Sequence, residues 1–363
     1  MASAEYAVLG PVIPRGFMQE RHAAELVFQR PETPYDGTMP RIPDSLMEGI
    51  AFLYPTADLA HKRERLGGTA FLVGREIVGG EEAFGQAVYL PYLVSNRHVV
   101  FEGSACVASV NRRDGSPPHV CEIDQNEWVA HPEHDLAAAC AYGHIDLAVH
   151  RISHIREARF LTPKIMEDSE LGVGDEAFMV GRFVNLQGSS GDNRPAARFG
   201  TLSMMIENIP TTGPIGAPVK QESFAVEMRS RTGFSGSPVI VYRTAATVLR
   251  PVPDEYAGFF ALLGVNWGYI KDETGENSFI NGVIPAWRIS ELLDLPALRA
   301  YQQMHEDRVA KIIKDKKKGE PDNLAQPTAL TAYPKIEENP RHKEDFNRLL
   351  GAAVGKPKRG GQT

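Results

Sequence analysis

The sequence predicts an all-β protein, built as a sandwich or a barrel, with a helix near its C-terminal end. Short β-like runs recur through residues 50–284, where clusters of Gly, Pro, Asn and Asp separate them. Helical periodicity is almost absent from this stretch and becomes clear in residues 285–317. Thirty-three glycines and 26 prolines in 363 residues agree with a chain that turns often.

The expected strands follow one another closely along the chain. The first three are 50–54, 67–74 and 87–95, which are rich in aliphatic and aromatic residues. The later ones are 105–110, 119–123, 147–152, 176–184, 198–206, 222–228, 238–242, 258–265 and 279–284. In the predicted helix, hydrophobic residues recur at helical spacing and Pro296 interrupts the pattern.

These patterns divide the chain into three parts. Residues 1–49 form an N-terminal extension, residues 50–295 a folded domain, and residues 296–363 a helix with a polar, disordered tail. The composition, 42% hydrophobic and 23% charged, is that of a globular protein. The net charge of −7 gives no reason to expect nucleic-acid binding.

The cellular location is predicted from what the sequence lacks. No apolar run approaches the ~20 residues that span a bilayer, and the first 30 residues do not form a secretory signal. The three cysteines, Cys106, Cys121 and Cys140, are too few for a disulfide framework and favour a reducing compartment. We therefore expect a cytoplasmic protein that binds neither nucleic acid nor membrane.

A serine in a glycine-containing turn is the first candidate for chemistry. Ser235 lies in Gly233-Phe-Ser-Gly-Ser-Pro238, before a β-branched run. A serine hydroxyl becomes a nucleophile when a base accepts its proton and nearby donors stabilise the oxyanion. Gly233 allows the backbone to turn so that its N–H and that of Ser235 point into one pocket. Taken alone, the motif also describes an ordinary turn.

Two upstream segments could supply a base and an acid. His98 ends an apolar strand, and Asp146 enters the apolar run 146–152, where a carboxylate needs a partner. Asp135, in His134-Asp-Leu-Ala-Ala138, is the alternative acid. We favour Asp146 because Val149 and Ile152 continue a strand, whereas alanines 137–139 are expected to pack a core poorly.

These motifs and their order resemble the trypsin-like (chymotrypsin-fold) serine peptidases, especially their HtrA-like branch. The matching segments are Gly68-Thr-Ala-Phe-Leu-Val73, Leu93-Val-Ser-Asn-Arg-His-Val-Val100, Asp146-Leu-Ala-Val-His-Arg-Ile152, Gly233-Phe-Ser-Gly-Ser-Pro238, Gly264-Val-Asn-Trp-Gly268 and Asn281-Gly-Val-Ile-Pro-Ala286. The resemblance implies two six-stranded antiparallel β-barrels, at about 50–165 and about 166–290. The residues after 295 leave little room for the peptide-binding domain that HtrA-like members often carry.

The resemblance also implies roles for the residues. His98 would accept the proton of Ser235, and Asp146 would hold the imidazole in the required tautomer. The N–H groups of Gly233 and Ser235 would form the oxyanion hole. The implied activity is cofactor-free hydrolysis of peptide bonds through an acyl-enzyme at Ser235. We expect a specific intracellular protein or peptide as substrate, and an activating protein partner is left open.

Substrate-binding residues follow from the same resemblance. Asn266, Trp267 and Gly268 would line the primary pocket, with Gly282 near its far wall. Arg229 stands where the pocket floor often lies. If its guanidinium points inward, it would favour an acidic residue at the cleavage site. An arginine at such a position more often faces solvent.

Two positions of the serine motif depart from the family pattern, and a function other than catalysis also stays open. Ser237 replaces a common glycine, a small change that touches no triad role. Phe234 replaces a usual polar residue, which leaves open what supports the oxyanion loop. The alternative is a catalytically silent, protease-like binding or regulatory protein. An α/β-hydrolase is disfavoured because its acid and histidine follow the serine, whereas only His305 and His342 do so here. No metal site is expected, since the histidines and cysteines lack zinc-binding spacing.

Overall fold

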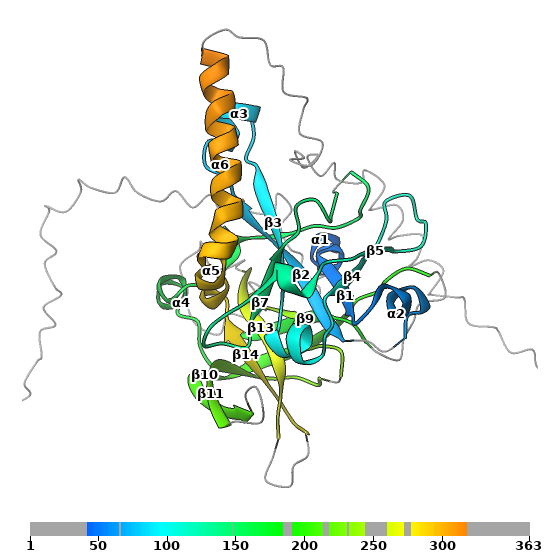
Figure 1. The fold of residues 1–363 in the computed structure, drawn as a ribbon. Coiled ribbons are helices and arrows are strands. Elements are labelled where there is room, and N and C mark those ends of the chain that lie inside the picture. The colour runs from blue at the N-terminus through cyan, green and yellow to red at the C-terminus, as the bar shows by residue number, and fades with distance from the viewer. Residues whose placement is uncertain are drawn as a thin grey trace, which may run out of the picture. The chain divides into compact units, whose positions relative to one another are not determined.

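Two β-sheets carry the fold in a computed structural model of the chain (Figure 1). The structure describes residues 42–64, 67–146, 148–183, 191–212, 218–230, 232–243, 260–271 and 277–317. Most of the predicted extension (to position 41) and of the predicted tail (from position 318) therefore lies outside the described residues. No described helix is long and apolar enough to cross a membrane.

The first sheet has eight strands in the order β5-β4-β1-β2-β3-β7-β6, with β8 paired to β2. The β2–β8 pairing is parallel and the others are antiparallel. The strands are β1 (Ile50–Tyr54), β2 (Gly68–Glu76), β3 (Tyr89–Ser95), β4 (Val107–Val110), β5 (His119–Cys121), β6 (Trp128–Ala130), β7 (Ala137–Cys140) and β8 (Ile155–Arg156).

The second sheet is a closed barrel of six strands in the order β10-β11-β14-β13-β12-β9. Closure leaves no unpaired edge along the barrel. The strands are β9 (Glu176–Gly181), β10 (Ala196–Thr212), β11 (Pro218–Glu227), β12 (Pro238–Tyr242), β13 (Phe260–Lys271) and β14 (Asn277–Pro285). The register of β13 against β14 shifts between Asn266 and Gly268, where the sequence predicts substrate binding, and again between Tyr269 and Lys271.

The predicted all-β fold with two antiparallel bodies is confirmed, with one difference in detail. The second body has the six strands expected. The first has eight, and among the described residues its path runs from β5 to β6 without a pairing that closes it. Each of these end strands has only three residues, which is too short for a long ladder.

The strand predicted at 147–152 is wrong, and the true strand lies earlier. Residues 148–150 form a turn, in which the N–H groups of Val149 and His150 donate to the carbonyl of Asp146. Val149 is 44% exposed. Strand β7 runs instead through three alanines, all fully buried between β3 and β6. Both faces of β7 pack against core side chains, and small residues fit such a doubly covered strand.

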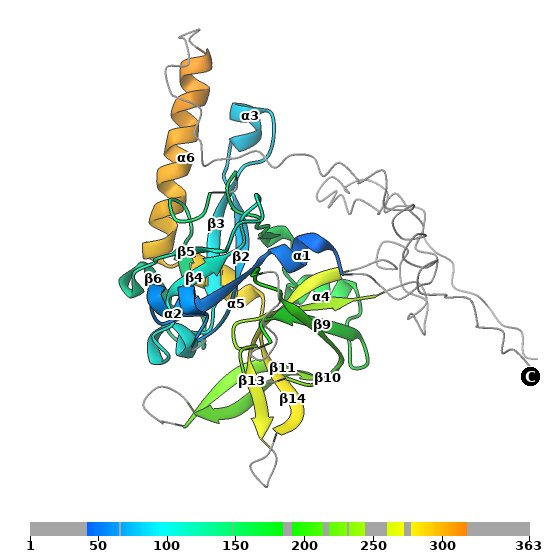
Figure 2. The same cartoon turned by 90° about the vertical axis from the view of Figure 1, so that its right-hand side faces the viewer.

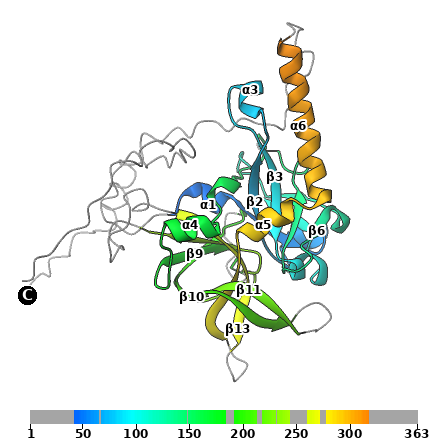
Figure 3. The same ribbon diagram turned by 90° about the vertical axis from the view of Figure 1, so that its left-hand side faces the viewer.

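The helices are short except for the last one. They are α1 (Asp44–Glu48), α2 (Ala57–Lys62), α3 (Gly80–Phe84), α4 (Pro163–Asp168), α5 (Trp287–Leu293) and α6 (Pro296–Lys317). The predicted C-terminal helix is thus divided at Pro296, which begins α6 because proline is well tolerated in a first helical turn. Helix α6 runs beside α3 and the β2–β3 hairpin in both turned views (Figure 2, Figure 3).

Candidate active site

The end of strand β3 places the predicted base. Ser95 closes the strand and donates its hydroxyl to the carbonyl of Thr69 on β2, over 2.7 Å. The chain then passes Asn96 and enters a single π-helical turn, His98–Glu102, in which Val99 and Val100 are buried. The imidazole of His98 keeps 35% of its surface exposed. Strand β3 therefore leads directly to a histidine whose side chain is partly exposed to solvent.

Asp135, rather than Asp146, is the carboxylate that the structure brings to His98. Its Oδ2 lies 2.6 Å from Nδ1 of His98, and its Oδ1 accepts the backbone N–H of His98 at 2.9 Å. Its own backbone is held as well, because Asn96 donates to its carbonyl at 2.9 Å and its N–H donates to Gln221 at 3.0 Å. All four polar atoms of Asp135 are thus bonded, so the direction of the carboxylate is fixed.

The prediction that Asp146 orients the histidine is therefore wrong. Asp146 accepts the N–H of Ala148 at 2.8 Å, and its carbonyl closes the turn that replaces the expected strand. Its backbone N–H donates to Nδ1 of His150 at 2.9 Å. Asp146 is thus a turn-capping residue, which is the ordinary role of an aspartate at such a position. The alternative acid, Asp135, occupies the place beside the imidazole.

The carboxylate changes the proton affinity of the ring. Burial lowers the pKa of His98, but the hydrogen bond and the negative charge of Asp135 outweigh it, so the pKa is raised above its ordinary value. A raised pKa means that the imidazolium is stabilised. With Nδ1 directed at Asp135, Nε2 is the nitrogen that can exchange a proton with another group.

The loop that carries Ser235 is tied to the first sheet. Thr69 on β2 donates its hydroxyl to the carbonyl of Gly233 at 2.7 Å and its N–H to the carbonyl of Ser235 at 2.9 Å. Gly233 and Gly236 have φ of 102° and 84°, which favours glycine. A Cβ on Gly236 would overlap the hydroxyl of Ser95. The serine loop therefore lies against the end of β3, just before His98.

Asn266 on β13 holds the same loop from the barrel side. Its Nδ2 donates to the carbonyl of Phe234 at 2.8 Å, and its carbonyl accepts the N–H of Gly236 at 2.9 Å. Since N–H and C=O of a trans peptide point in opposite directions, the N–H of Ser235 is directed away from Asn266. Asn266 is fully buried, so its side chain supports the loop and is not a wall that a substrate could reach.

Close packing of the Phe234 ring supports the serine loop in place of the polar residue that the resembled family usually has at this position. The Phe234 ring is fully buried, with the guanidinium carbon of Arg198 5.7 Å from its centroid. A Cβ on Gly181 of β9 would approach this ring within 2.8 Å and would overlap the hydroxyl of Ser237. The loop is therefore seated closely on β9, and the departures at Phe234 and Ser237 do not leave it unsupported.

Arg229 does not form a pocket floor in this structure. It is exposed, and its guanidinium carbon lies 5.8 Å from the centroid of the Phe279 ring, which is itself 52% exposed. Arg229 lies just beyond the end of β11, between the buried residues Met228 and Ser230. Asn281 donates to the carbonyl of Met228 at 2.6 Å and fixes this arrangement.

Trp267 covers the strand predicted to form the far wall of the pocket. Its indole N–H donates to the hydroxyl of Ser223 on β11 at 2.8 Å, and a Cβ on Gly282 would overlap its ring. Only glycine at this position allows the ring to lie flat on β14. Ser235 Oγ lies 3.5 Å from the carbonyl oxygen of Trp267. Substrate contacts by Trp267, Gly268 and Gly282 stay a prediction.

One group with metal-ligating side chains lies at the edge of the first sheet. The ligand atoms of His119, Cys121 and His150 lie within 4.8 Å of one another. However, Nδ1 of His150 accepts the N–H of Asp146, so the proton of the neutral ring is on Nε2, 2.7 Å from Nδ1 of His119. Burial raises the pKa of Cys121 to about 12, which keeps its thiol protonated. Metal binding would have to displace these protons.

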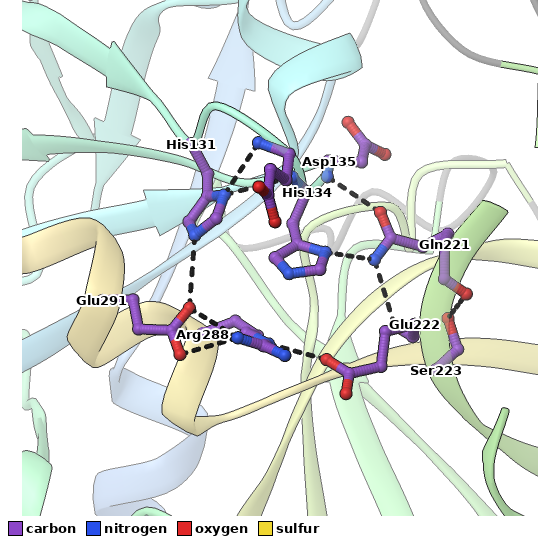
Figure 4. Close-up of polar contacts among 9 residues, drawn as sticks. His131, His134, Asp135, Gln221, Glu222, Ser223, Arg288 and Glu291 are labelled. Atoms are coloured by element: carbon purple, nitrogen blue, oxygen red, sulfur yellow. Dashed lines mark hydrogen bonds and ion pairs between the residues drawn. The ribbon is translucent and has the colours of Figure 1, made fainter. Parts of the chain in front are cut away.

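A second group, His131, His134 and Glu291, meets the same objection. Nδ1 of His131 accepts the N–H groups of Glu133 and His134, each at 3.1 Å, so its Nε2 carries the proton. That nitrogen points to Glu291, 3.6 Å away. The bonds explain the group as a hydrogen-bonded cluster next to Asp135 (Figure 4).

Comparisons with known proteins find distant likenesses among solved structures. No protein-family model and no curated protein sequence matches this chain. A variant of the HtrA-type protease AlgW, solved with a tripeptide, is 18% identical, with 70% of this chain and 62% of that chain covered. An inactive form of Rv3671c from M. tuberculosis is 16% identical (69% and 87% covered), and the MamO protease domain from Magnetospirillum magneticum is 15% identical (68% and 96% covered).

All three comparisons have a TM-score of 0.39. At that level they carry no argument of their own, and the chain spans less than two thirds of the AlgW chain. The three proteins are named as proteases. The fold assignment rests on the strand order of this chain, and the functional argument rests on its site.

Proposed function

We propose that this protein is a serine endopeptidase. The observation that carries the proposal is the pair formed by His98 and Asp135, with 2.6 Å between Nδ1 and Oδ2. A carboxylate in this place keeps the proton on Nδ1 and leaves Nε2 to act as a base. The loop of Ser235 is bonded to Thr69 and packs against the end of β3 that leads to His98. Base, acid and nucleophile thus come from elements that are bonded to one another.

In the proposed reaction, Ser235 Oγ attacks the carbonyl carbon of a peptide bond while its proton moves to Nε2 of His98. Asp135 stabilises the imidazolium, and the N–H groups of Gly233 and Ser235 bind the oxyanion. The C–N bond breaks as His98 gives the proton to the leaving amine, and an ester remains on Ser235. Water then cleaves this ester with the same base, which restores the serine.

Covalent labelling at Ser235 tests the proposal directly. A fluorophosphonate probe reacts with an activated serine hydroxyl, so the wild-type protein is expected to be labelled and Ser235→Ala is not. Ser237→Ala is the matched control, because Ser237 is two residues away and fully buried. It should still be labelled. Wild-type protein that is neither labelled nor able to cleave peptides would indicate the alternative, a silent protease-like binding protein.

The pH dependence of hydrolysis gives a second prediction. Because only neutral His98 can accept a proton, kcat/KM is expected to fall as the pH drops through the His98 pKa. Asp135 raises that pKa, so the midpoint should lie above the ordinary histidine value of about 6.5. The measurement is a profile of kcat/KM against pH with a fluorogenic peptide. A midpoint well below that value would contradict the raised pKa.

A further inference from the structure

Gln221 connects the barrel to the carboxylate beside His98. It lies on β11 and is 3% exposed. Its Oε1 accepts the backbone N–H of Asp135 at 3.0 Å, across the junction between the barrel and the first sheet. Its Nε2 donates to the carbonyl of Glu222 at 3.0 Å and to Nδ1 of His134 at 3.0 Å (Figure 4). One amide therefore joins the acid of the site to a buried histidine.

Two backbone groups fix which way this amide points. The N–H of Asp135 can only donate, so it must face Oε1 of Gln221. The carbonyl of Glu222 can only accept, so it must face Nε2. Turning the amide over would bring two donors together at Asp135 and two acceptors together at Glu222. The orientation of Gln221 is thus determined independently of His134.

The fixed amide in turn determines the protonation of His134. Because Nε2 of Gln221 donates, Nδ1 of His134 must accept, and the ring is the neutral tautomer with its proton on Nε2. The whole residue is 7% exposed, and Nε2 is buried without a hydrogen-bond partner in the part of the chain that the structure describes. A second proton would have to enter on Nδ1, directly against the donor of Gln221.

We propose that Gln221 is a positioning residue for Asp135, and that its bond to the Asp135 N–H holds only while His134 is neutral. The proposal deepens the serine endopeptidase function and rests on it. Protonation of His134 makes Nδ1 a donor, so the Gln221 amide must rotate to offer its oxygen. Rotation removes the acceptor from the part-buried N–H of Asp135 and leaves that group without its hydrogen bond. Asp135, whose carboxylate orients His98, then loses one of the two hydrogen bonds that hold its backbone.

Burial and the neighbouring charges determine the pH at which His134 gains a second proton. Burial, the neighbouring His131 and the guanidinium of Arg288 on α5 oppose the proton, whereas Glu222 and Glu291 favour it. Arg288 bonds both carboxylates, at 2.6 Å and 2.7 Å. The pKa of His134 is lowered from its ordinary value, while that of His98 is raised. His134 therefore gains its second proton at a lower pH than the pH at which protonation of His98 inactivates the base.

Replacement of the amide tests the positioning role. Gln221→Leu removes all three side-chain hydrogen bonds of Gln221 and should lower kcat by ~10–100-fold with KM nearly unchanged, because small misplacements of catalytic groups have effects of this size. Gln302→Leu is the matched control: Gln302 is 1% exposed, lies on α6 and bonds Glu76 and Glu306 instead. Thermal unfolding of both variants reports any loss of stability. Equal kcat values for the two folded variants would overturn the proposal.

The slope of the acid limb tests the role of the His134 proton. In wild-type protein, log kcat/KM should fall with slope one below the His98 pKa and steepen towards slope two around the His134 pKa, until the further ~10–100-fold loss expected for the missing Gln221 bond is complete. His134→Asn places an oxygen that accepts at every pH close to the position of Nδ1, so its slope should remain one. The readout is the slope and not the size of kcat, with folding checked by circular dichroism at each pH. A slope of two in His134→Asn would overturn this part.

A spectroscopic arm separates failure of this inference from failure of the proposed function. The pKa of His98 can be measured by NMR in Ser235→Ala protein, where no turnover is needed. Adding Gln221→Leu should lower that pKa, since a misdirected carboxylate stabilises the imidazolium less while burial continues to oppose it. An unchanged pKa would overturn the positioning role even if the protein cleaves peptides. A lowered pKa would support it even if no substrate is found.

Discussion

Asp135→Asn is expected to lower kcat by about 10⁴-fold, with a much smaller change in KM. The backbone N–H of His98 donates to Oδ1 of Asp135, so the amide oxygen of an asparagine must take that place. Its NH₂ group then faces Nδ1 of His98, which must accept. The ring proton moves to Nε2, and the nitrogen that should receive the serine proton already carries one. Steady-state hydrolysis of a fluorogenic peptide measures both constants.

Asp146→Asn is the control for this prediction. The substitution keeps a side-chain oxygen that can accept the N–H of Ala148, so the turn should survive with a change of about 0.5 kcal/mol or less. The activity of this variant should stay close to wild type. A large loss in Asp146→Asn combined with an active Asp135→Asn would reverse the assignment of the acid and contradict the structure described above.

The choice between these two aspartates shows where the sequence was ambiguous. The apolar Val149 makes Asp146 resemble the first residue of a strand, yet Val149 is 44% exposed and lies in a turn. The alanines after Asp135 looked too small for a core, but they form a strand with both faces covered. A usable signal was present in the unbroken apolar run 136–141, since a doubly covered strand shows no alternation.

The support of the site could not be predicted for a different reason. Ser235 and His98 lie in short sequence motifs, so a few neighbouring residues are enough to identify them as candidates. Gln221 and Asp135 are 86 positions apart, and their bond depends on how the barrel docks on the first sheet. Asn266 was expected to line a pocket but is buried as a brace for the serine loop. Such contacts follow from tertiary packing, which composition and periodicity do not specify.

Gly236→Ala is the second change with a large expected effect. A Cβ at this position would overlap the backbone carbonyl of Thr69, which cannot move without disturbing β2, and the hydroxyl of Ser95, which donates to that carbonyl. The loop must therefore withdraw, which displaces both the hydroxyl and the N–H of Ser235. Misplacement of a nucleophile and loss of an oxyanion donor are each worth ~10² or more, so we expect kcat/KM to fall by at least ~10³-fold.

Gly143→Ala separates this clash from ordinary backbone strain. Gly143 has φ of 89°, close to the 84° of Gly236, but a Cβ there meets nothing within 4 Å. Both variants should therefore lose about 1–2 kcal/mol of stability to the same left-handed strain. Only Gly236→Ala should also lose activity and fluorophosphonate labelling. Urea unfolding measures the strain, and labelling measures the site. If both alanines reduced labelling alike, the close seating of the serine loop on β2 would not be what positions Ser235.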